Sequence, residues 1–560
     1  MEGAECEIQG NFVYVDKTKL IYDLVKPERG VYFLSRPRRF GKSLLVSTLS
    51  SIFKGDKELF KNLRIYDSDY AWEKHPVIKL SMANSQVSET DTMETRIKIQ
   101  LNYIAEEYGV ELDLKPYVDI VFTDLIHKLH QKTGMKVVVL VDEYDGPIIN
   151  HINETAAQRA VSRLRRTNDR SALGVHEDHE AGENAENGVV QWSLNDIPKA
   201  NENRNLLRNF YKVLKDEDAS LRFVFLTGVS KFAKTSIFSG LNNLKILTME
   251  QKYSALLGYT QEELEHYFNS YIEDLSESLS LEKNRTISKI KRWYNGYRFS
   301  EDKTRVYNPF STMLMFSELK FKNYWFATGT PTFLINLIKK ENPDIEDFEK
   351  EVNISEFELD SYDLESLPLI PLMFDTGYLT IKEAKRRADI TSFSLSYPNN
   401  EVKIALIHNL LAAYSEENSA KVSSFVIALS DMILENDLES FIIKLKSYFA
   451  SIPYDIVPKR NLDEKYFQLI FYLLMRSTSF NVNIEDRTSD GRIDLVLEAD
   501  DNIYLFEFKI DSSARAALKQ IKDKKYYEKY SNIPKKLFLI GINFDTKTRN
   551  ISEYLVEEYN

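Results

Sequence analysis

The stretch GVYFLSRPRRFGKS, residues 30–43, decides the fold of the N-terminal half of the chain. Residues 31–35 are an apolar run typical of a buried strand, and residues 44–53 have helical spacing. A strand, a tight loop ending in Gly-Lys-Ser and a helix are the layout of a phosphate-binding loop. In such a loop, backbone N–H groups and the helix dipole face an anion. The stretch therefore predicts an α/β domain with a P-loop.

The loop residues have expected roles. Lys42 is expected to contact the β- and γ-phosphates of ATP, and Ser43 to offer a hydroxyl to Mg²⁺. Arg36 stands where the first Gly of G-x-x-x-x-G-K-S would fall. Either Arg36 holds the loop in another way, or the site binds nucleotide poorly. The other expected nucleotide contacts are Arg38, Arg39 and Gly41.

A second element of nucleotide hydrolysis is expected about 100 residues further along. Residues 137–141 are continuously apolar, as a central parallel strand requires, and they end in Asp142 and Glu143. Asp142 would hold Mg²⁺ through water, and Glu143 would polarise the attacking water. Asp145 is a further acid nearby, and its role is left open. Solvated acids at a strand end are the alternative. Thr227, near the end of an apolar strand, would sense the γ-phosphate, unless it only ends the strand.

Length and composition set the class of protein. The 560 residues suggest roughly two to four domains, and the 43% hydrophobic content is enough for real cores. A net charge of −12 argues against a wholly cationic nucleic-acid binder. The single cysteine, Cys6, excludes a disulfide framework and a Cys-based zinc site. Because no membrane span and no signal peptide are expected, the default class is a cytoplasmic enzyme.

Two regions between the motifs carry weaker signals. The segment at about 154–201 changes from arginine-rich to acidic and polar, which indicates an insertion. His176 and His179 within it are candidate metal ligands, but a solvated acidic loop is the favoured interpretation. Aromatic residues are frequent in the mostly helical region 259–340, where a packed core is favoured over base stacking. Residues 375–393 are expected to add a β-hairpin.

The C-terminal hundred residues contain a second group of charged residues. The expected order is a helix, three strands, a basic helix at about residues 513–530 and a strand. In GRIDLVLEADDNIYLFEFKI, a hairpin would bring Asp494 beside Glu507, and Lys509 would share their face because the side-chain period is two. Phe508 would point into the core. The expected strands are residues 479–484, 492–499, 502–510 and 535–544.

These residues suit a metal-dependent phosphodiesterase. Asp494, Glu507 and the carbonyl of Phe508 would bind Mg²⁺, and Lys509 would position the water and stabilise negative charge at phosphorus. Glu464, at the start of the preceding helix, is a further candidate ligand. A hairpin with exposed charges is the alternative, but burying Glu and Lys is costly unless they are paired or metal-bound. A nucleic-acid backbone would meet Gln520, Lys522 and Lys524 of the basic helix.

The chain resembles the prokaryotic AAA-ATPase-like proteins with a C-terminal PD-(D/E)XK nuclease-superfamily domain. The stretches that carry this resemblance span nearly the whole chain, in order: YVDKTKLI, RPRRFGKSLL, VVLVDEYDGPII, FVFLTGVSKF, FSGLNNL, YNGYRFS, VYNPFS, GRIDLVLEADDNIYLFEFKI and ALKQIKDKKYYEKY. The resemblance implies that Arg36 is the family's own loop form. The family's Pro before the first nuclease acid is Ile493 here, and the segment 154–201 departs from the family pattern.

The resemblance implies a P-loop NTPase parallel-sheet domain, a helical middle region and a restriction-endonuclease-like α/β domain at the C-terminus. The expected parts are an AAA-ATPase-like domain over 1–258, a helical, aromatic middle domain over 259–380, a helical connector over 381–455 and a nuclease-like domain over 456–560.

The expected function is ATP binding and hydrolysis joined to a Mg²⁺-dependent nuclease that acts on nucleic acid, DNA more than RNA. One alternative is a signalling or scaffold ATPase whose nuclease fold binds without cutting. Another is a nucleotide-binding switch with negligible turnover, because of Arg36. A homo-oligomer is left open.

Overall fold

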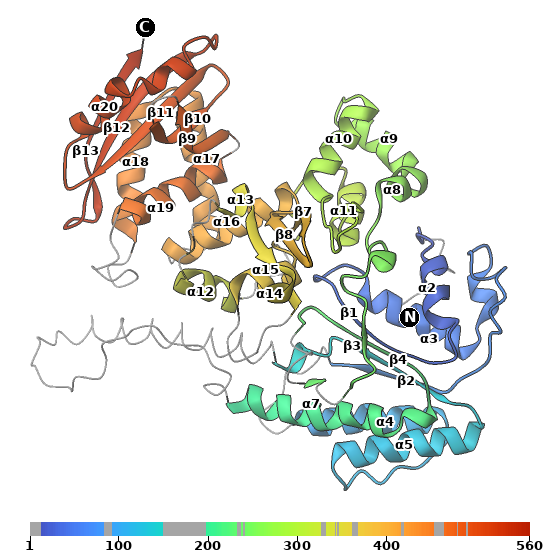
Figure 1. Ribbon diagram of the computed structural model, residues 1–560. Coiled ribbons are helices and arrows are strands. Elements are labelled where there is room, and N and C mark those ends of the chain that lie inside the picture. Colours follow the sequence, from blue (N-terminus) through green and yellow to red (C-terminus); the bar gives the residue numbers. More distant parts are fainter. Residues whose placement is uncertain are drawn as a thin grey trace, which may run out of the picture. The chain divides into compact units, whose positions relative to one another are not determined.

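A computed structural model of the chain forms two compact units, Met1–Val402 and Lys403–Asn560, each described here by itself (Figure 1). Within the described parts, no helix is both long and apolar enough to cross a bilayer. The structure describes residues 13–82, 92–148, 198–231, 237–238, 241–325, 332–341, 343, 347–360, 368–415, 419–452, 464–478, 480–488 and 491–559.

A parallel sheet forms the centre of the first unit. Among the described residues it has five strands in the order β2-β3-β4-β1-β5, and every pairing is parallel. Nearly all residues of β1, β3 and β4 are buried, as expected for strands covered on both faces. The carboxyl ends of these strands therefore meet at one edge. The strands are β1 (Gly30–Ser35), β2 (Val77–Ser81), β3 (Val137–Asp142), β4 (Leu221–Gly228) and β5 (Lys245–Ile246).

Helices cover this sheet. Helix α3 packs against β2, β3 and β4, and α4, α5 and α7 group together along the sheet (Figure 1). Phe122 and Phe210 stack at 4.4 Å between α5 and α7. The predicted strand and helix around the P-loop are thus confirmed. The elements are α2 (Thr18–Val25), α3 (Lys42–Lys54), α4 (Met93–Glu107), α5 (Val118–Thr133), α7 (Pro198–Asp216) and the 3₁₀ turns η1 (Lys57–Phe60), η3 (Asp218–Ser220) and η5 (Gln251–Tyr253).

The region after the sheet is helical and rich in aromatic residues. Tyr294 and Tyr307 are fully buried in one apolar cluster with Phe268, and Tyr297 is buried nearby. Because their rings form the core, they are not a surface for base stacking. The helices of this region are α8 (Gln261–Tyr267), α9 (Asn269–Ser278), α10 (Lys283–Tyr294) and α11 (Pro309–Glu318).

A small antiparallel sheet completes the first unit. Its described strands have the order β6-β8-β7, and the predicted hairpin is β7 and β8. This sheet extends across the expected boundary at residue 380, so the expected division into domains remains a prediction. The elements are α12 (Thr332–Glu341), α13 (Asp347–Lys350), β6 (Val352–Ser355), α14 (Glu356–Asp360), α15 (Leu369–Thr376), β7 (Thr380–Arg387) and β8 (Ile390–Ser396).

The second unit has a mixed sheet whose described strands have the order β13-β12-β11-β10-β9. Only the pairing of β11 with β12 is parallel. The predicted order of elements is confirmed, with one additional edge strand, β13. The elements are α16 (Asn400–Ser415), α17 (Ser419–Leu434), α18 (Leu438–Ser451), α19 (Glu464–Ser477), β9 (Asn481–Thr488), β10 (Gly491–Glu498), β11 (Asn502–Ile510), α20 (Ala514–Asp523), η8 (Tyr526–Lys529), β12 (Lys536–Asp545) and β13 (Asn550–Tyr559).

Alternation along β11 places its charged residues on one face. Phe508 is buried against Phe471 of α19, with ring centroids 4.9 Å apart. Ile503 and Leu505 share a cluster with Ile521 of α20 on the other face. Since side chains alternate, Glu507 and Lys509 belong to the face of α20.

Candidate functional site

The phosphate loop ends in a glycine that its backbone requires. Gly41 precedes α3 with φ of +87°, in the left-handed region that residues with a Cβ rarely adopt. Its carbonyl accepts the N–H of Leu45 at 3.0 Å, which closes the first turn of α3. Arg39 also has a positive φ, +66°. The loop thus turns sharply into a helix whose first residue is Lys42.

Lys42 is buried at the centre of this loop. Its ammonium donates to the carbonyl oxygens of Arg36 at 3.0 Å and Pro37 at 2.9 Å. Burial lowers the pKa of Lys42, and the negative charges of Asp142, Asp145 and Glu143 oppose this shift. The loop lysine and the acids after β3 therefore lie in one electrostatic environment, as the sequence predicts.

Arg36 supports the loop from inside. Its guanidinium is 1% exposed and donates to the carbonyl oxygens of Ser35 at 2.9 Å, Thr248 at 2.9 Å and Tyr253 at 3.3 Å. It also stacks 4.0 Å from the ring centroid of Phe299, and burial lowers its pKa to about 9. Of the two alternatives for Arg36, this geometry favours the one in which it holds the loop.

Three polar residues of the loop and of the helix start face solvent. Arg38, Arg39 and Ser43 are exposed, and the Arg39 guanidinium lies 4.7 Å from the ring centroid of Phe310. The charge of Arg38 lowers the pKa values of both Lys42 and Glu143. Arg38 is therefore close enough to act on an anion held by the loop.

The end of β3 carries a strained acid. Asp142 is buried, and its carboxylate accepts the N–H of Glu143 at 3.0 Å. Glu143 has a φ of +53°, a left-handed conformation that is costly for a residue with a side chain and occurs often at functional sites. Burial raises the pKa of Glu143, Asp142 raises it further, and Lys42 lowers it.

Asp145 holds the loop after β4, a role that the sequence left open. It is 1% exposed and accepts the N–H groups of Val229 at 3.1 Å and Ser230 at 2.8 Å, together with the Ser230 hydroxyl at 2.6 Å. A Cβ on Gly228 would lie 2.5 Å from the Asp145 carboxylate, so only glycine fits there.

Thr227 has its hydroxyl inside the sheet. The side chain is fully buried and donates to the carbonyl of Leu34 at 2.7 Å, across the pairing of β4 with β1. This hydrogen bond between neighbouring strands is enough to explain why a threonine occupies this position of β4. A phosphate-sensing role would require that bond to open, so this geometry favours the structural alternative.

In the second unit, the predicted charged residues converge. Asp494 accepts the main-chain N–H of Phe508 at 2.7 Å, which places it beside β11. The Lys509 ammonium lies 3.3 Å from the Glu507 carboxylate and donates to the Phe508 carbonyl at 2.9 Å. The Glu507 side chain is 1% exposed and that of Lys509 is 24% exposed, so the site opens at its lysine.

The oxygens of this site fit a hard divalent cation. Burial and the negative charge of Asp494 together raise the pKa of Glu507 to about 8, against the opposing charge of Lys509. Glu507 Oε2 is buried and has no hydrogen-bond partner among the described residues, which is costly in a folded protein. Carboxylate and carbonyl oxygens are the ligands that Mg²⁺ prefers. The described residues contain no group of three or more His, Cys, Asp or Glu side chains suited to a metal.

A tyrosine missed by the sequence analysis borders this site. The Tyr526 hydroxyl shares a hydrogen bond with the side chain of Gln520, and burial together with Glu507 and Asp494 raises the pKa of Tyr526. A Cβ on Gly491 would lie 2.8 Å from that hydroxyl oxygen. Tyr526 thus connects Gln520 with the surroundings of the two acids, and the contact of Gln520 with nucleic acid remains a prediction. Only the density of tyrosines after the basic helix could have pointed to Tyr526.

The other residues predicted to contact nucleic acid or metal show no contact with the two acids of this site in the described part of the chain. Lys522 is paired with Glu557 of β13 at 2.6 Å, and Lys524 is exposed where α20 ends. Glu464 begins α19, but its side chain lies outside the described residues, as do His176 and His179. The metal-binding role of Glu464 remains a prediction.

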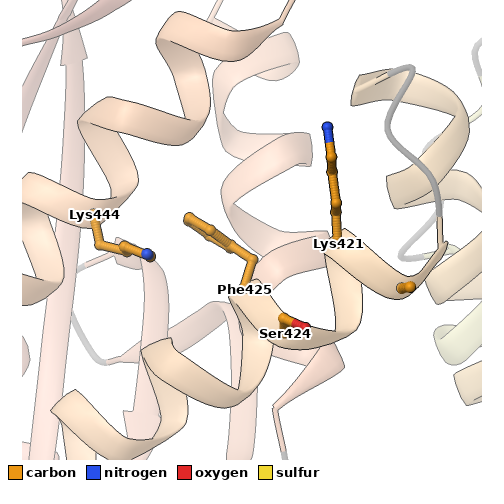
Figure 2. A pocket seen from close by; sticks show the side chains of 5 residues that line it. Lys421, Ser424, Phe425 and Lys444 are labelled. Carbon is orange, nitrogen blue, oxygen red and sulfur yellow. The ribbon is translucent and has the colours of Figure 1, made fainter.

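An open pocket of about 420 Å³ lies between α17 and α18. Figure 2 shows Phe425 and Lys444 facing one another across it, and the Lys444 ammonium is 5.6 Å from the ring centroid. None of the predicted site residues lines this pocket. Its lining residues are Ala420, Lys421, Ser424, Phe425 and Lys444.

Comparisons with known proteins find a family match in each half of the chain. A family model described as "Predicted AAA-ATPase" matches residues 6–170 and 188–238, and the break between them falls inside the expected insertion. A model of the PD-(D/E)XK nuclease superfamily matches residues 462–554. The ORC1 protein of Aeropyrum pernix in complex with DNA matches 72% of this chain and 97% of its own, at 10% identity. Its TM-score of 0.24 is too low to indicate a shared fold.

A full-length relative connects the two halves. The "Uncharacterized protein in vnfD 5'region" of Azotobacter chroococcum mcd 1 is 34% identical over 553 residues, which cover 98% of this chain and 96% of the relative. The two domain models and this relative together account for nearly the whole sequence. The chain therefore belongs to the prokaryotic AAA-ATPase-like proteins with a C-terminal PD-(D/E)XK nuclease-superfamily domain.

Proposed function

We propose that the protein binds and hydrolyses ATP in its first unit and cleaves nucleic acid, DNA more than RNA, with a divalent metal in its second. The observation that carries the nuclease half is the buried Glu507 oxygen that finds no hydrogen-bond partner in the described part of the chain, beside Asp494 and Lys509. A carboxylate oxygen left in this state is stabilised by a cation.

In the first unit, Lys42 would bind the β- and γ-phosphates, and Ser43 and Asp142 would hold Mg²⁺, which neutralises phosphate charge. Binding requires the Lys42 ammonium to exchange the two loop carbonyls for phosphate oxygens. Glu143 would orient the attacking water and accept its proton. Its raised pKa favours that role, because burial makes the carboxylate a stronger base.

In the second unit, Asp494, Glu507 and the Phe508 carbonyl would hold the metal, which supplies an activated water and stabilises charge at the phosphate. Lys509 lies at the open side of the site, where its ammonium can face a phosphodiester. The Glu507 proton must leave before a metal binds, since its pKa is about 8. Gln520 and Lys524 would contact the backbone of the substrate.

The test is cleavage of DNA and RNA by the purified chain with Mg²⁺ or Mn²⁺, with and without ATP. Glu507→Gln and Asp494→Asn should abolish cleavage while leaving ATP turnover unchanged. Lys42→Ala should abolish ATP binding, and Glu143→Gln should keep it while lowering turnover by about 100-fold or more. Cleavage that survives both acid variants would overturn the nuclease assignment.

A second function has one observation in its favour. The Lys509 ammonium already contacts two of the oxygens assigned to the metal, so the lysine can neutralise the site without one. The protein would then be a signalling or scaffold ATPase whose nuclease fold binds nucleic acid without cutting it. Tight binding of DNA with no cleavage under any divalent metal would support this alternative.

A further inference from the structure

A buried ion pair joins the loop after β4 to the last turn of α15. The Lys231 ammonium lies 3.9 Å from Asp375 Oδ1, and the two side chains are 5% and 1% exposed. The main-chain N–H of Lys231 also donates to Asp375 Oδ2, at 2.9 Å. Removing one charge of such a buried pair is strongly unfavourable, so the pair fixes the position of this loop.

The same loop is held on its other side by the segment that follows β3. Asp145 accepts two N–H groups and one hydroxyl from Val229 and Ser230. The Tyr144 hydroxyl donates to the Ser230 carbonyl at 2.8 Å, and the Tyr144 N–H donates to the Thr227 carbonyl at 3.0 Å. Residues 229–231 therefore connect Asp375 with the two residues that come directly after Glu143.

The end of α15 also contacts the phosphate loop. A Cβ on Gly377 would lie 2.7 Å from the Pro37 ring atoms, so the glycine permits close packing there. Beside this contact, the Phe40 ring lies 4.8 Å from Tyr297 and 5.5 Å from Phe299, measured between centroids. One short segment, residues 375–377, thus reaches both halves of the nucleotide site, the phosphate loop and the acids after β3.

We propose that Asp375 is a positioning residue for ATP hydrolysis. It would act through Lys231 and Ser230 on the segment that carries Asp142 and Glu143, and so set where Glu143 meets the attacking water. This inference rests on the proposed ATPase function. Because the contact acts on the acids and leaves the ammonium of Lys42 in place, Asp375 should affect turnover more than nucleotide binding.

The test compares Asp375→Asn with the double variant Asp375→Asn/Lys231→Met, in the full chain. Asn keeps an acceptor for the Lys231 N–H but removes the charge that faces the ammonium. ATP turnover by Asp375→Asn should fall about tenfold to 100-fold, because small misplacements of catalytic groups have effects of this size. The dissociation constant for a fluorescent ATP analogue should change by less than about threefold, and the double variant should recover most of the turnover.

Glu263→Gln is the matched control. Glu263 pairs with Lys17 at 2.5 Å and accepts the N–H of Thr260 at 2.8 Å, and it belongs to α8, outside both β3 and the loop after β4; the two paired side chains are 22% and 12% exposed. This variant should lower the melting temperature and leave turnover per folded molecule unchanged. Unchanged turnover in Asp375→Asn, or no recovery in the double variant, would overturn the inference while the ATPase stands. Absence of ATP turnover in the wild-type protein would instead overturn the proposed function, and the inference with it.

Discussion

Lys509 and Glu507 form an ion pair at 3.3 Å on the same face of β11, and the same ammonium donates to the Phe508 carbonyl at 2.9 Å. A divalent cation and the lysine would therefore compete for the same oxygens. If a cation binds as proposed, the ammonium would move toward the open side of the site, where a phosphodiester would arrive. The charge balance of the site would then depend on this exchange.

The first prediction concerns Glu507 and pH. Its pKa is raised from 4.5 to about 8 in the folded protein, so the folded state binds more protons than the unfolded state between these values. The free energy of unfolding in EDTA should therefore decrease as pH rises from about 5 to 8. Urea denaturation at several pH values measures this slope.

Glu507→Gln is the control for this slope. An amide cannot titrate, so the variant should lose the part of the pH dependence that comes from Glu507. The free energy of unfolding of the variant minus that of the wild type should therefore be larger at pH 8 than at pH 5. Parallel pH profiles for the wild type and the variant would show that the pKa of the Glu507 carboxyl is not raised in the folded protein.

The second prediction is that Lys509→Met separates metal binding from cleavage. Loss of the competing ammonium should strengthen Mn²⁺ binding once Glu507 has lost its proton. Because Lys509 lowers the pKa of Glu507, the variant's carboxyl keeps its proton to a higher pH than the wild type's, so binding is compared over a series of pH values from about 8 upward. Cleavage should be abolished at the same time. Calorimetric titration and a nuclease assay give the two quantities. Weaker Mn²⁺ binding in this variant would contradict the proposed exchange.

The third prediction compares two arginines of the phosphate loop. Arg36→Met leaves the carbonyls of Ser35, Thr248 and Tyr253 without their buried donor, so it should cost about 1–3 kcal/mol of stability and weaken nucleotide binding. Arg38→Met, which changes an exposed residue, should weaken nucleotide binding with little change in melting temperature. Equal loss of stability in both variants would refute the supporting role of Arg36.

The fourth prediction uses two glycines. In Gly228→Ala, the new Cβ would lie 2.5 Å from both the Asp145 carboxylate and the Tyr144 ring, which should destabilise the protein by about 1–3 kcal/mol and lower ATP turnover. Gly134→Ala introduces a Cβ that meets nothing within 4 Å, at φ of +68°. It should cost about 1–2 kcal/mol of conformational strain and leave turnover per folded molecule unchanged. Urea denaturation and an ATPase assay distinguish the two.

Local patterns in the sequence predicted the elements that carry the sites. The apolar runs of β1, β3 and β4 and the Gly-Lys-Ser turn are short-range signals, so both ends of the nucleotide site could be placed. The period of two along β11 was enough to put Glu507 and Lys509 on one face and Phe508 on the other.

Long-range contacts could not be predicted in the same way. The Arg36 guanidinium reaches carbonyls 212 and 217 positions further along the chain, and no local pattern indicates them. The Thr227 hydroxyl is likewise engaged by Leu34, 193 positions away. The basic helix predicted over residues 513–530 ends at Asp523, because Lys525 adopts a left-handed backbone with φ of +50°.

Strand β13 forms one edge of the C-terminal sheet, and its exposed outer half carries acidic side chains. Glu553 accepts the N–H of Ala514 at the start of α20, and Glu557 pairs with Lys522. Glu558 pairs with Lys536 in the same way, at 4.0 Å. This edge therefore carries ion-paired side chains, and charged residues on an edge strand discourage a foreign strand from extending the sheet. The second unit is thus protected against the edge-to-edge association that an apolar outer strand would invite.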